Sequence, residues 1–239
     1  MGNKSFKFKQ FEVFHDKTAM KVGTDGVLLG AWVDLDNATS VLDVGTGTGL
    51  IALMVAQRSK EAVVRAIEID KDAAEQAKEN VRLSSFADRV EVEMVSFQHF
   101  VAAAEQKFDV VVSNPPFFVD ALHAPDEART NARHNTTLSI YDLLELGDRL
   151  LNPNGRLAVV YPADHMEQLL LTIAEKGWYL LRQTDVYTTV ESKSPKRVLL
   201  ELCREVGIEG TVNRLVIEER RHQYTREYVE LTQDFYLKM

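Results

Sequence analysis

Residues 41–50 read VLDVGTGTGL, and this stretch decides the fold. The apolar run Val41–Val44 predicts a strand, and Leu50–Arg58 predicts the helix that follows it. Open α/β sheets bind their ligands where a strand ends at such a turn. The three glycines between the two elements have no Cβ, so the backbone can pass close to a ligand. The free N–H groups at the start of the helix would face that ligand.

The spacing of the glycines indicates the kind of ligand. Gly45, Gly47 and Gly49 alternate as G-x-G-x-G, unlike the G-x-G-x-x-G of dinucleotide-binding turns. Asp43 stands inside the strand just before them. Its carboxylate suits a ligand with a cationic near end, such as the amino group and sulfonium of S-adenosylmethionine (SAM), and would repel a pyrophosphate. We expect SAM; the alternatives are a dinucleotide and a tight turn that binds nothing.

The next two strand ends supply further candidate cofactor contacts. Glu68 lies at the penultimate position of the second predicted strand, about twenty residues after the glycines, where a carboxylate can accept both ribose hydroxyls. Asp70 is placed to cap the following helix. Ser96 and Phe97 follow the third predicted strand. Ser96 can hydrogen-bond the adenine, and Phe97 either packs on the purine or belongs to the core.

Predicted strands and helices alternate along the chain, which indicates βαβ units and a largely parallel sheet. The connection between the last two predicted strands, about nine residues, is too short for a parallel crossover, so that pair should be antiparallel. The expected fold class is α/β, with a Rossmann-like, mostly parallel sheet of seven strands, the last antiparallel, and helices on both faces. The strands are expected at 41–44, 63–69, 90–95, 108–113, 156–161, 179–187 and 197–205, and the helices at 50–58, 71–83, 140–151 and 163–176.

The sharpest motif, Ser113-Asn114-Pro115-Pro116-Phe117, directly follows the fourth predicted strand. Two successive prolines fix φ and donate no hydrogen bonds, so the backbone is rigid. The Asn114 side-chain carbonyl and the Pro115 backbone carbonyl can each accept one N–H of a planar amine, which aims its lone pair at a methyl donor by positioning alone. Phe117 offers a face for a flipped base. We expect Asn114, Pro115, Pro116 and Phe117 to be catalytic; the alternative is a rigid turn.

The composition limits the other possibilities. The chain has 239 residues, of which 45% are hydrophobic and 27% charged, which suits one α/β domain. A single cysteine, Cys203, excludes an intramolecular disulfide and fits a reducing cytoplasm. The net charge of −8 argues against broad non-specific nucleic-acid binding but allows a local basic patch. We see no signal-peptide core, no apolar run of the roughly 18 residues that a membrane helix needs, and no histidine cluster at metal spacing.

Together these motifs resemble class I SAM-dependent methyltransferases of the N-P-P-[FY] group, which modify planar amines. Three narrower segments are similar to the bacterial family that methylates N6 of the adenine just 3′ of the anticodon in valine tRNA: FKQF at 8–11, MKVGTDGVLLGAW at 20–32 and LTQDFYL at 231–237. The resemblance runs nearly end to end. It implies the class I methyltransferase fold, SAM as the cofactor and tRNA as the substrate, with adenine-37 of tRNA1(Val) as the target.

The resemblance also implies residue roles. It places catalysis at residues 114–117 and a SAM pocket at Thr24, Asp25, Asp43, Gly45, Gly47, Gly49 and Glu68. Ser96 departs from the family pattern, which usually carries an acid there, and the adenine contacts are expected at Ser96 and Phe97. Thr24 or Asp25 is also placed to cap a helix.

The organisation expected from this resemblance has two parts. Residues 1–39 form an extension that covers substrate and cofactor, and residues 40–239 form the methyltransferase domain. The candidate RNA contacts, each alternatively an ordinary solvated residue, are Lys7, Lys9, Arg129, Arg133, Arg220 and Arg221. We expect a cytoplasmic monomer that binds neither metal nor membrane.

Several related activities share these motifs. A glutamine methyltransferase of release factors carries a helical N-terminal domain, whereas about forty residues precede the glycine turn here. A DNA adenine methyltransferase usually carries a separate target-recognition region. A guanine-N2 methyltransferase of ribosomal RNA is not distinguished by motif. A module that binds SAM and RNA without catalysis would not need carbonyls that align an amine.

Overall fold

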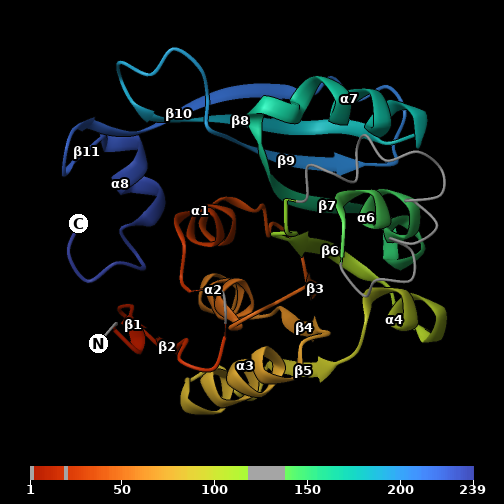
Figure 1. The fold of residues 1–239 in the computed structure, drawn as a ribbon. Coiled ribbons are helices and arrows are strands. Elements are labelled where there is room, and N and C mark those ends of the chain that lie inside the picture. The colour runs from red at the N-terminus through yellow and green to blue at the C-terminus, as the bar shows by residue number, and fades with distance from the viewer. Residues whose placement is uncertain (1–2, 19–20, 118–137) are drawn as a thin grey trace.

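The structure, a computed structural model, describes residues 3–18, 21–117 and 138–239 (Figure 1). Its centre is a nine-stranded sheet with the order β11-β10-β8-β9-β7-β6-β3-β4-β5. These strands are β3 (Ser40–Val44), β4 (Val63–Glu68), β5 (Val90–Met94), β6 (Phe108–Ser113), β7 (Leu151–Pro162), β8 (Tyr179–Thr189), β9 (Arg197–Cys203), β10 (Thr211–Arg220) and β11 (Gln223–Tyr224). The described α-helices are α1 (Thr24–Trp32), α2 (Leu50–Arg58), α3 (Lys71–Leu83), α4 (Phe97–Ala103), α6 (Ile140–Leu146), α7 (Met166–Glu175) and α8 (Arg226–Thr232).

The predicted class and strand directions are confirmed. β5, β4, β3, β6 and β7 pair in parallel. β9 runs antiparallel to both of its neighbours, β7 and β8. The helices α2 and α3 begin and end at the predicted residues. The sheet therefore has the expected parallel centre, with its antiparallel strand inserted between β7 and β8.

The predicted count of seven strands is wrong, because the described residues contribute nine to this sheet. β10 pairs in parallel with β8, and the short β11 folds back antiparallel onto β10. Leu215 is the one buried residue of β10. This strand therefore lacks the apolar run by which the other strands were predicted.

Two predicted boundaries also differ. The helix expected at 140–151 ends at Leu146, and a 3-10 turn over Gly147–Leu150 leads directly into β7. β7 begins at Leu151, which pairs with Phe108, and the register shifts before Arg156. A bulge can keep turn-forming residues inside a strand. The helix expected at 163–176 is likewise a 3-10 turn followed by α7, and α4 was not predicted.

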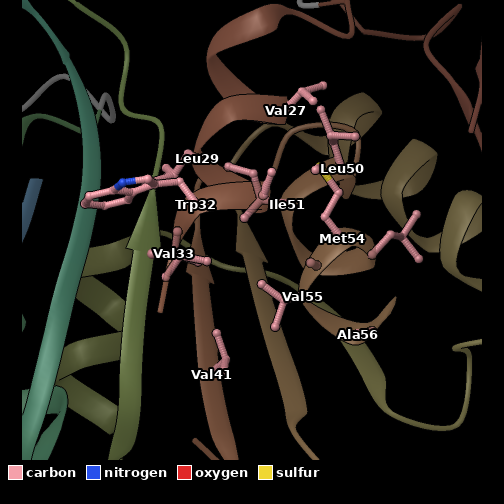
Figure 2. Close-up of a cluster of buried hydrophobic side chains, with 14 of the residues drawn as sticks. Val27, Leu29, Trp32, Val33, Val41, Leu50, Ile51, Met54, Val55 and Ala56 are labelled. Carbon is pink, nitrogen blue, oxygen red and sulfur yellow. The ribbon is translucent and has the colours of Figure 1, made fainter. Parts of the chain in front are cut away.

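Helices cover both faces of the sheet, and strand side chains alternate between two cores (Figure 1). Val41 and Val110 face the core under α1, α2, α3 and α8. Leu42 and Val111, the next residues along, face the core under α4, α6 and α7. Figure 2 shows side chains of α1 and α2 gathered in the first core beside Val41. A sheet buried on both faces leaves its strand ends as the place for a ligand.

The segment before the glycine turn shares the first core. β1 (Ser5–Lys7) and β2 (Glu12–Phe14) form a separate two-stranded sheet. Phe8 is buried and forms a β-bridge with Tyr236, so segments near the two ends of the chain pair with each other. α1 packs on α2 and α8, and its N-cap is Gly23, not Thr24 or Asp25 as predicted. That residues 1–39 cover substrate and cofactor stays a prediction.

Candidate active site

The register of the sheet brings the two main motifs together. Val44, the last residue of β3, pairs with Ile67 of β4 on one side and with Ser113 of β6 on the other. Ser113 is fully buried, and its hydroxyl donates a hydrogen bond of 2.8 Å to the Val44 carbonyl. Gly45 and Asn114 directly follow β3 and β6, and Glu68 is the last residue of β4, so the three residues stand at the same edge of the sheet, where the parallel strands end. This edge carries the glycine turn and the N-P-P-F motif.

The glycine turn depends on left-handed backbone. The φ angles of Gly45, Gly47 and Gly49 are +70°, +58° and +82°, a region that residues with a Cβ adopt at a cost. A Cβ on Gly47 would meet no atom within 4 Å, so this residue faces open space. The backbone N–H groups of Gly45 and Thr46 donate to the Ile67 carbonyl, which ties the turn to β4.

Asp43 is the most unusual group at this edge. Its side chain is fully buried, and Oδ2 accepts hydrogen bonds from the Thr46 hydroxyl at 2.5 Å and the Ala52 N–H at 3.1 Å. Oδ1 has no hydrogen-bond partner among the described residues. Burial raises the pKa of Asp43 to about 7, against the opposing hydrogen bonds. A buried carboxylate oxygen without a partner is costly and suits a nearby cation.

Glu68 is held by backbone donors. Its Oε2 accepts the N–H of Gly47 at 2.8 Å, and its Oε1 accepts the N–H groups of Ile69 and Asp70 at 2.8 and 2.9 Å. Asp70 is the N-cap of α3, and its carboxylate accepts the N–H of Ala73, as predicted. The carboxylate of Glu68 is thus fixed against the glycine turn. Its oxygens can still accept further hydrogen bonds, because an ionised carboxylate has about four lone-pair sites.

The third strand end is built differently. Ser96 is the N-cap of α4, and its Oγ accepts the His99 N–H at 3.2 Å and lies 2.7 Å from the His99 ring Nδ1. Phe97 is 4% exposed and packs in the core under α4, α6 and α7. Of the two interpretations of Phe97, its burial favours the core.

The N-P-P-F motif is partly enclosed. Pro115 is buried, and Asn114 is half-buried. Within the described part of the chain, the Asn114 side chain makes no hydrogen bond to another described residue. The Phe117 ring contacts Tyr161 edge-on, with centroids 5.9 Å apart, and the Arg197 guanidinium lies 5.1 Å from the Phe117 centroid.

Tyr161 and Arg197 were not predicted as site residues. Pro162, the residue after Tyr161, pairs with Arg197 across β7 and β9. Arg197 also donates from Nε to the Asp25 carboxylate at 2.8 Å, so Asp25 faces β9 through this ion pair. An arginine beside an apolar strand carries no sequence signal for such a contact, because the partners lie far away along the chain.

The candidate RNA contacts do not gather in one place. Lys7 pairs with Glu12 at 3.7 Å, and Lys9 donates to the Gln233 carbonyl at 2.6 Å. Arg220 ends β10 and Arg221 follows it; both are exposed, four strands away from β6 in the sheet. Arg129 and Arg133 lie outside the described residues.

In residues 3–18, 21–117 and 138–239, no three His, Cys, Asp or Glu side chains stand close enough together to hold a metal ion. Every helix in these ranges is too short or too polar to span a lipid bilayer.

Solved structures and a family model define the class. A family model named methyltransferase small domain matches residues 13–190. A predicted O-methyltransferase of Agrobacterium tumefaciens superposes with a TM-score of 0.70 at 20% identity, covering 88% of this chain and 96% of that one. The ribosomal protein L11 methylase of Lactobacillus delbrueckii subsp. bulgaricus superposes with a TM-score of 0.53 at 19% identity, covering 75% of this chain and 77% of that one. The fold and the family model together define a class I methyltransferase, whose methyl donor is SAM.

Closer relatives narrow this class to one family. The tRNA1(Val) (adenine(37)-N6)-methyltransferase of Phocaeicola vulgatus is 49% identical over 239 residues, which cover 100% of both chains. The protein of the same name in Parabacteroides distasonis is 46% identical over the same length and coverage. This chain therefore belongs to the tRNA1(Val) (adenine(37)-N6)-methyltransferase family.

Proposed function

We propose that this protein transfers the methyl group of SAM to N6 of adenine-37, next to the anticodon of tRNA1(Val). The observation that carries the proposal is the pairing of Val44 with Ser113, because it sets the glycine turn beside the N-P-P-F motif. The full-length similarity to enzymes of that name supports the tRNA and the position.

The proposed SAM pocket follows the strand ends. The unpartnered Oδ1 of Asp43 fits the cationic end of SAM, and the Glu68 carboxylate fits its ribose hydroxyls. The open space at Gly47 allows the cofactor to approach the backbone. Thr24, Gly45 and Gly49 complete the pocket in this proposal. Asp25, Ser96 and Phe97 contribute less directly, since their side chains contact Arg197, His99 and the core.

The proposed chemistry needs little more than positioning. SAM supplies a methyl group activated by its sulfonium. The adenine amine is a poor nucleophile because its lone pair is delocalised into the ring. Asn114 and the Pro115 carbonyl would each accept one N–H and direct that lone pair, while the two prolines keep the carbonyl from turning away. Phe117 would stack on the base.

The remaining parts of the proposal concern the surroundings. Arg220 ends β10, which runs parallel to β8, and Arg221 follows it, at the same edge of the sheet as the N-P-P-F motif, so both are candidates for phosphates farther along the RNA. Lys7 and Lys9 are candidates on the β1–β2 hairpin. We also propose a monomer that acts in the cytoplasm, where its tRNA substrate is, without a metal.

A transfer assay tests the function. Labelled SAM is incubated with the purified protein and an unmodified tRNA1(Val) transcript, with a matched transcript that carries guanine at position 37, and with ribosomal RNA and a release factor. We expect label in the first transcript alone, found as N6-methyladenosine by mass spectrometry. Label on rRNA guanine or on a release-factor glutamine, with none on tRNA, would overturn the proposal in favour of those activities. SAM binding without transfer to any acceptor would favour a binding module.

A further inference from the structure

Arg197 joins three segments that are far apart in the sequence. Its Nε donates to Asp25 in the first turn of α1, and its guanidinium lies 5.1 Å from the centroid of the Phe117 ring. It is the first residue of β9, opposite Pro162 at the end of β7. The side chains of Arg197 and Asp25 are 23% and 26% exposed, so the pair is largely shielded from water. None of these contacts is local.

The Phe117 ring is consequently held from two directions. Arg197 approaches within cation–π distance, and Tyr161 contacts the ring edge-on at 5.9 Å with an interplanar angle of 88°. Tyr161 is buried, so it offers a rigid support. A guanidinium near an aromatic ring attracts its electron-rich face, and more strongly where water is largely excluded. The ring orientation therefore depends on where the guanidinium is fixed.

We infer that Arg197 is a positioning residue that orients Phe117 for the target base, and that Asp25 holds Arg197 in place. The inference rests on the proposed function, because it assumes that Phe117 stacks on the methylated base. A stacking ring must be at a set angle if the amine is to meet Asn114 and the Pro115 carbonyl. Arginine suits this task better than lysine, because its planar guanidinium can pair with a carboxylate and contact an aromatic ring at the same time.

The other end of β9 provides a matched control. Arg204 follows the last residue of β9, donates to Asp148 at 2.7 Å, and lies 4.7 Å from the Trp178 ring centroid. The arrangement of arginine, carboxylate and aromatic ring is thus the same, at the edge of the sheet where β8 begins. If Arg197 only stabilises the fold, removing either arginine will have similar consequences.

The test compares R197M, R197K, D25N and R204M by single-turnover methyl transfer to tRNA1(Val), with melting temperature and the Kd for SAM and for tRNA measured alongside. We expect R197M to lower the transfer rate about 30-fold, with both Kd values within about twofold of the native protein. D25N should lower it less, R197K should recover part of the loss, and R204M should leave it unchanged.

A double variant, D25N/R197M, examines the link between the two residues. Because Asp25 acts through Arg197, the double variant should be no slower than R197M alone. Native-like transfer by R197M, or an equal loss in R204M, would overturn the inference while leaving the proposed function intact. Absence of transfer by the native chain would instead overturn the function and the inference with it.

Discussion

The backbone N–H of Gly47 donates a hydrogen bond of 2.8 Å to Oε2 of Glu68, which joins the glycine turn to the end of the neighbouring strand. The other oxygen of Glu68 accepts two further backbone N–H groups, from Ile69 and Asp70. Three backbone donors thus hold one carboxylate in a set position. Such a carboxylate needs no rearrangement before it accepts the hydroxyls of a ribose.

Replacing Glu68 should therefore weaken SAM binding. In E68Q the side-chain NH2 group must face one of the backbone N–H donors, and the anionic acceptor is lost. We expect the Kd for SAM, measured by calorimetry, to rise at least about tenfold, which corresponds to about 1.4 kcal/mol. Glu91, an exposed residue of β5, provides the control variant E91Q. Equal affinities of E68Q and E91Q for SAM would contradict the assignment.

Asp43 should make stability fall with rising pH. Its pKa is about 7 in the folded protein and ordinary when unfolded, so between about pH 4 and 7 the folded state holds a proton that the unfolded state has released. D43N keeps an acceptor for Thr46 and Ala52 and removes the charge. The native protein should lose about 3 kcal/mol of its free energy of unfolding, relative to D43N, when the pH is raised from 5 to 8. Urea unfolding at both pH values measures this, and parallel pH profiles would refute it.

Whereas D43N should stabilise the fold at high pH, it should weaken SAM binding there. The native protein should bind SAM more tightly as the pH rises from 5.5 to 7.5, because the cationic ligand favours the ionised form of Asp43. In D43N this dependence should disappear, and the affinity at pH 7.5 should fall. An unchanged pH dependence of the Kd in D43N would mean that another group titrates.

Asn114 should be needed for transfer and not for the cofactor. N114A removes a carbonyl acceptor from the amine and leaves Asp43 and Glu68 untouched, so we expect the transfer rate to fall about 10³-fold with the Kd for SAM within about twofold. Asn213 on β10 is exposed and serves as the control N213A. Full transfer activity in N114A would remove the proposed mechanism.

The lysines of the β1–β2 hairpin test the proposed RNA surface. K7A/K9A should raise the Kd for tRNA and leave the Kd for SAM unchanged, since phosphate contacts carry much of nucleic-acid affinity. Exposed Lys60 and Lys107 precede β4 and β6, at the opposite edge from the N-P-P-F motif, and K60A/K107A controls for loss of charge. Lys9 also bonds to Gln233, so the melting temperature is measured too. Equal tRNA binding by the two variants would contradict an RNA role for this hairpin.

Asp109 should stabilise the fold at the opposite edge of the sheet. Its carboxylate accepts hydrogen bonds from Thr39, Ser40 and Asn152, and although burial works against them, these bonds hold the pKa of Asp109 at about 2. Since the pKa is lowered on folding, the stabilisation is present above about pH 4 and is lost as the pH falls toward 2.

The corresponding variant is D109N. At pH 7 it should lower the free energy of unfolding by about 1–2 kcal/mol, a figure reduced for the partial exposure of the group. The difference should shrink as the pH falls through the same window. Asp88 is exposed, and D88N serves as the control in the same urea titration. If D109N and D88N unfold at the same urea concentration, the hydrogen bonds of Asp109 contribute little.

Local sequence determined the parts that depend on neighbours along the chain. The glycine turn, the helices at 50–58 and 71–83, and the Asp70 cap follow from apolar period and backbone preference, and each lies where the pattern predicted. The class of ligand could also be predicted from local sequence, because Asp43 and the three glycines lie within one short segment. The family was also readable from linear segments, such as residues 20–32.

Tertiary structure decided the rest, because the contacts concerned join residues of elements that are not neighbours along the chain. Strand β10 has too few buried positions to be predicted without its pairing to β8. The segment of α1 is apolar on all sides, and it packs as a helix between α2, α8 and the sheet. The pairing of Asp25 and Phe117 with Arg197 arises only when β9 enters the sheet antiparallel to β7. A sequence pattern records periodicity, whereas such a contact exists only once burial has fixed the register of the strands.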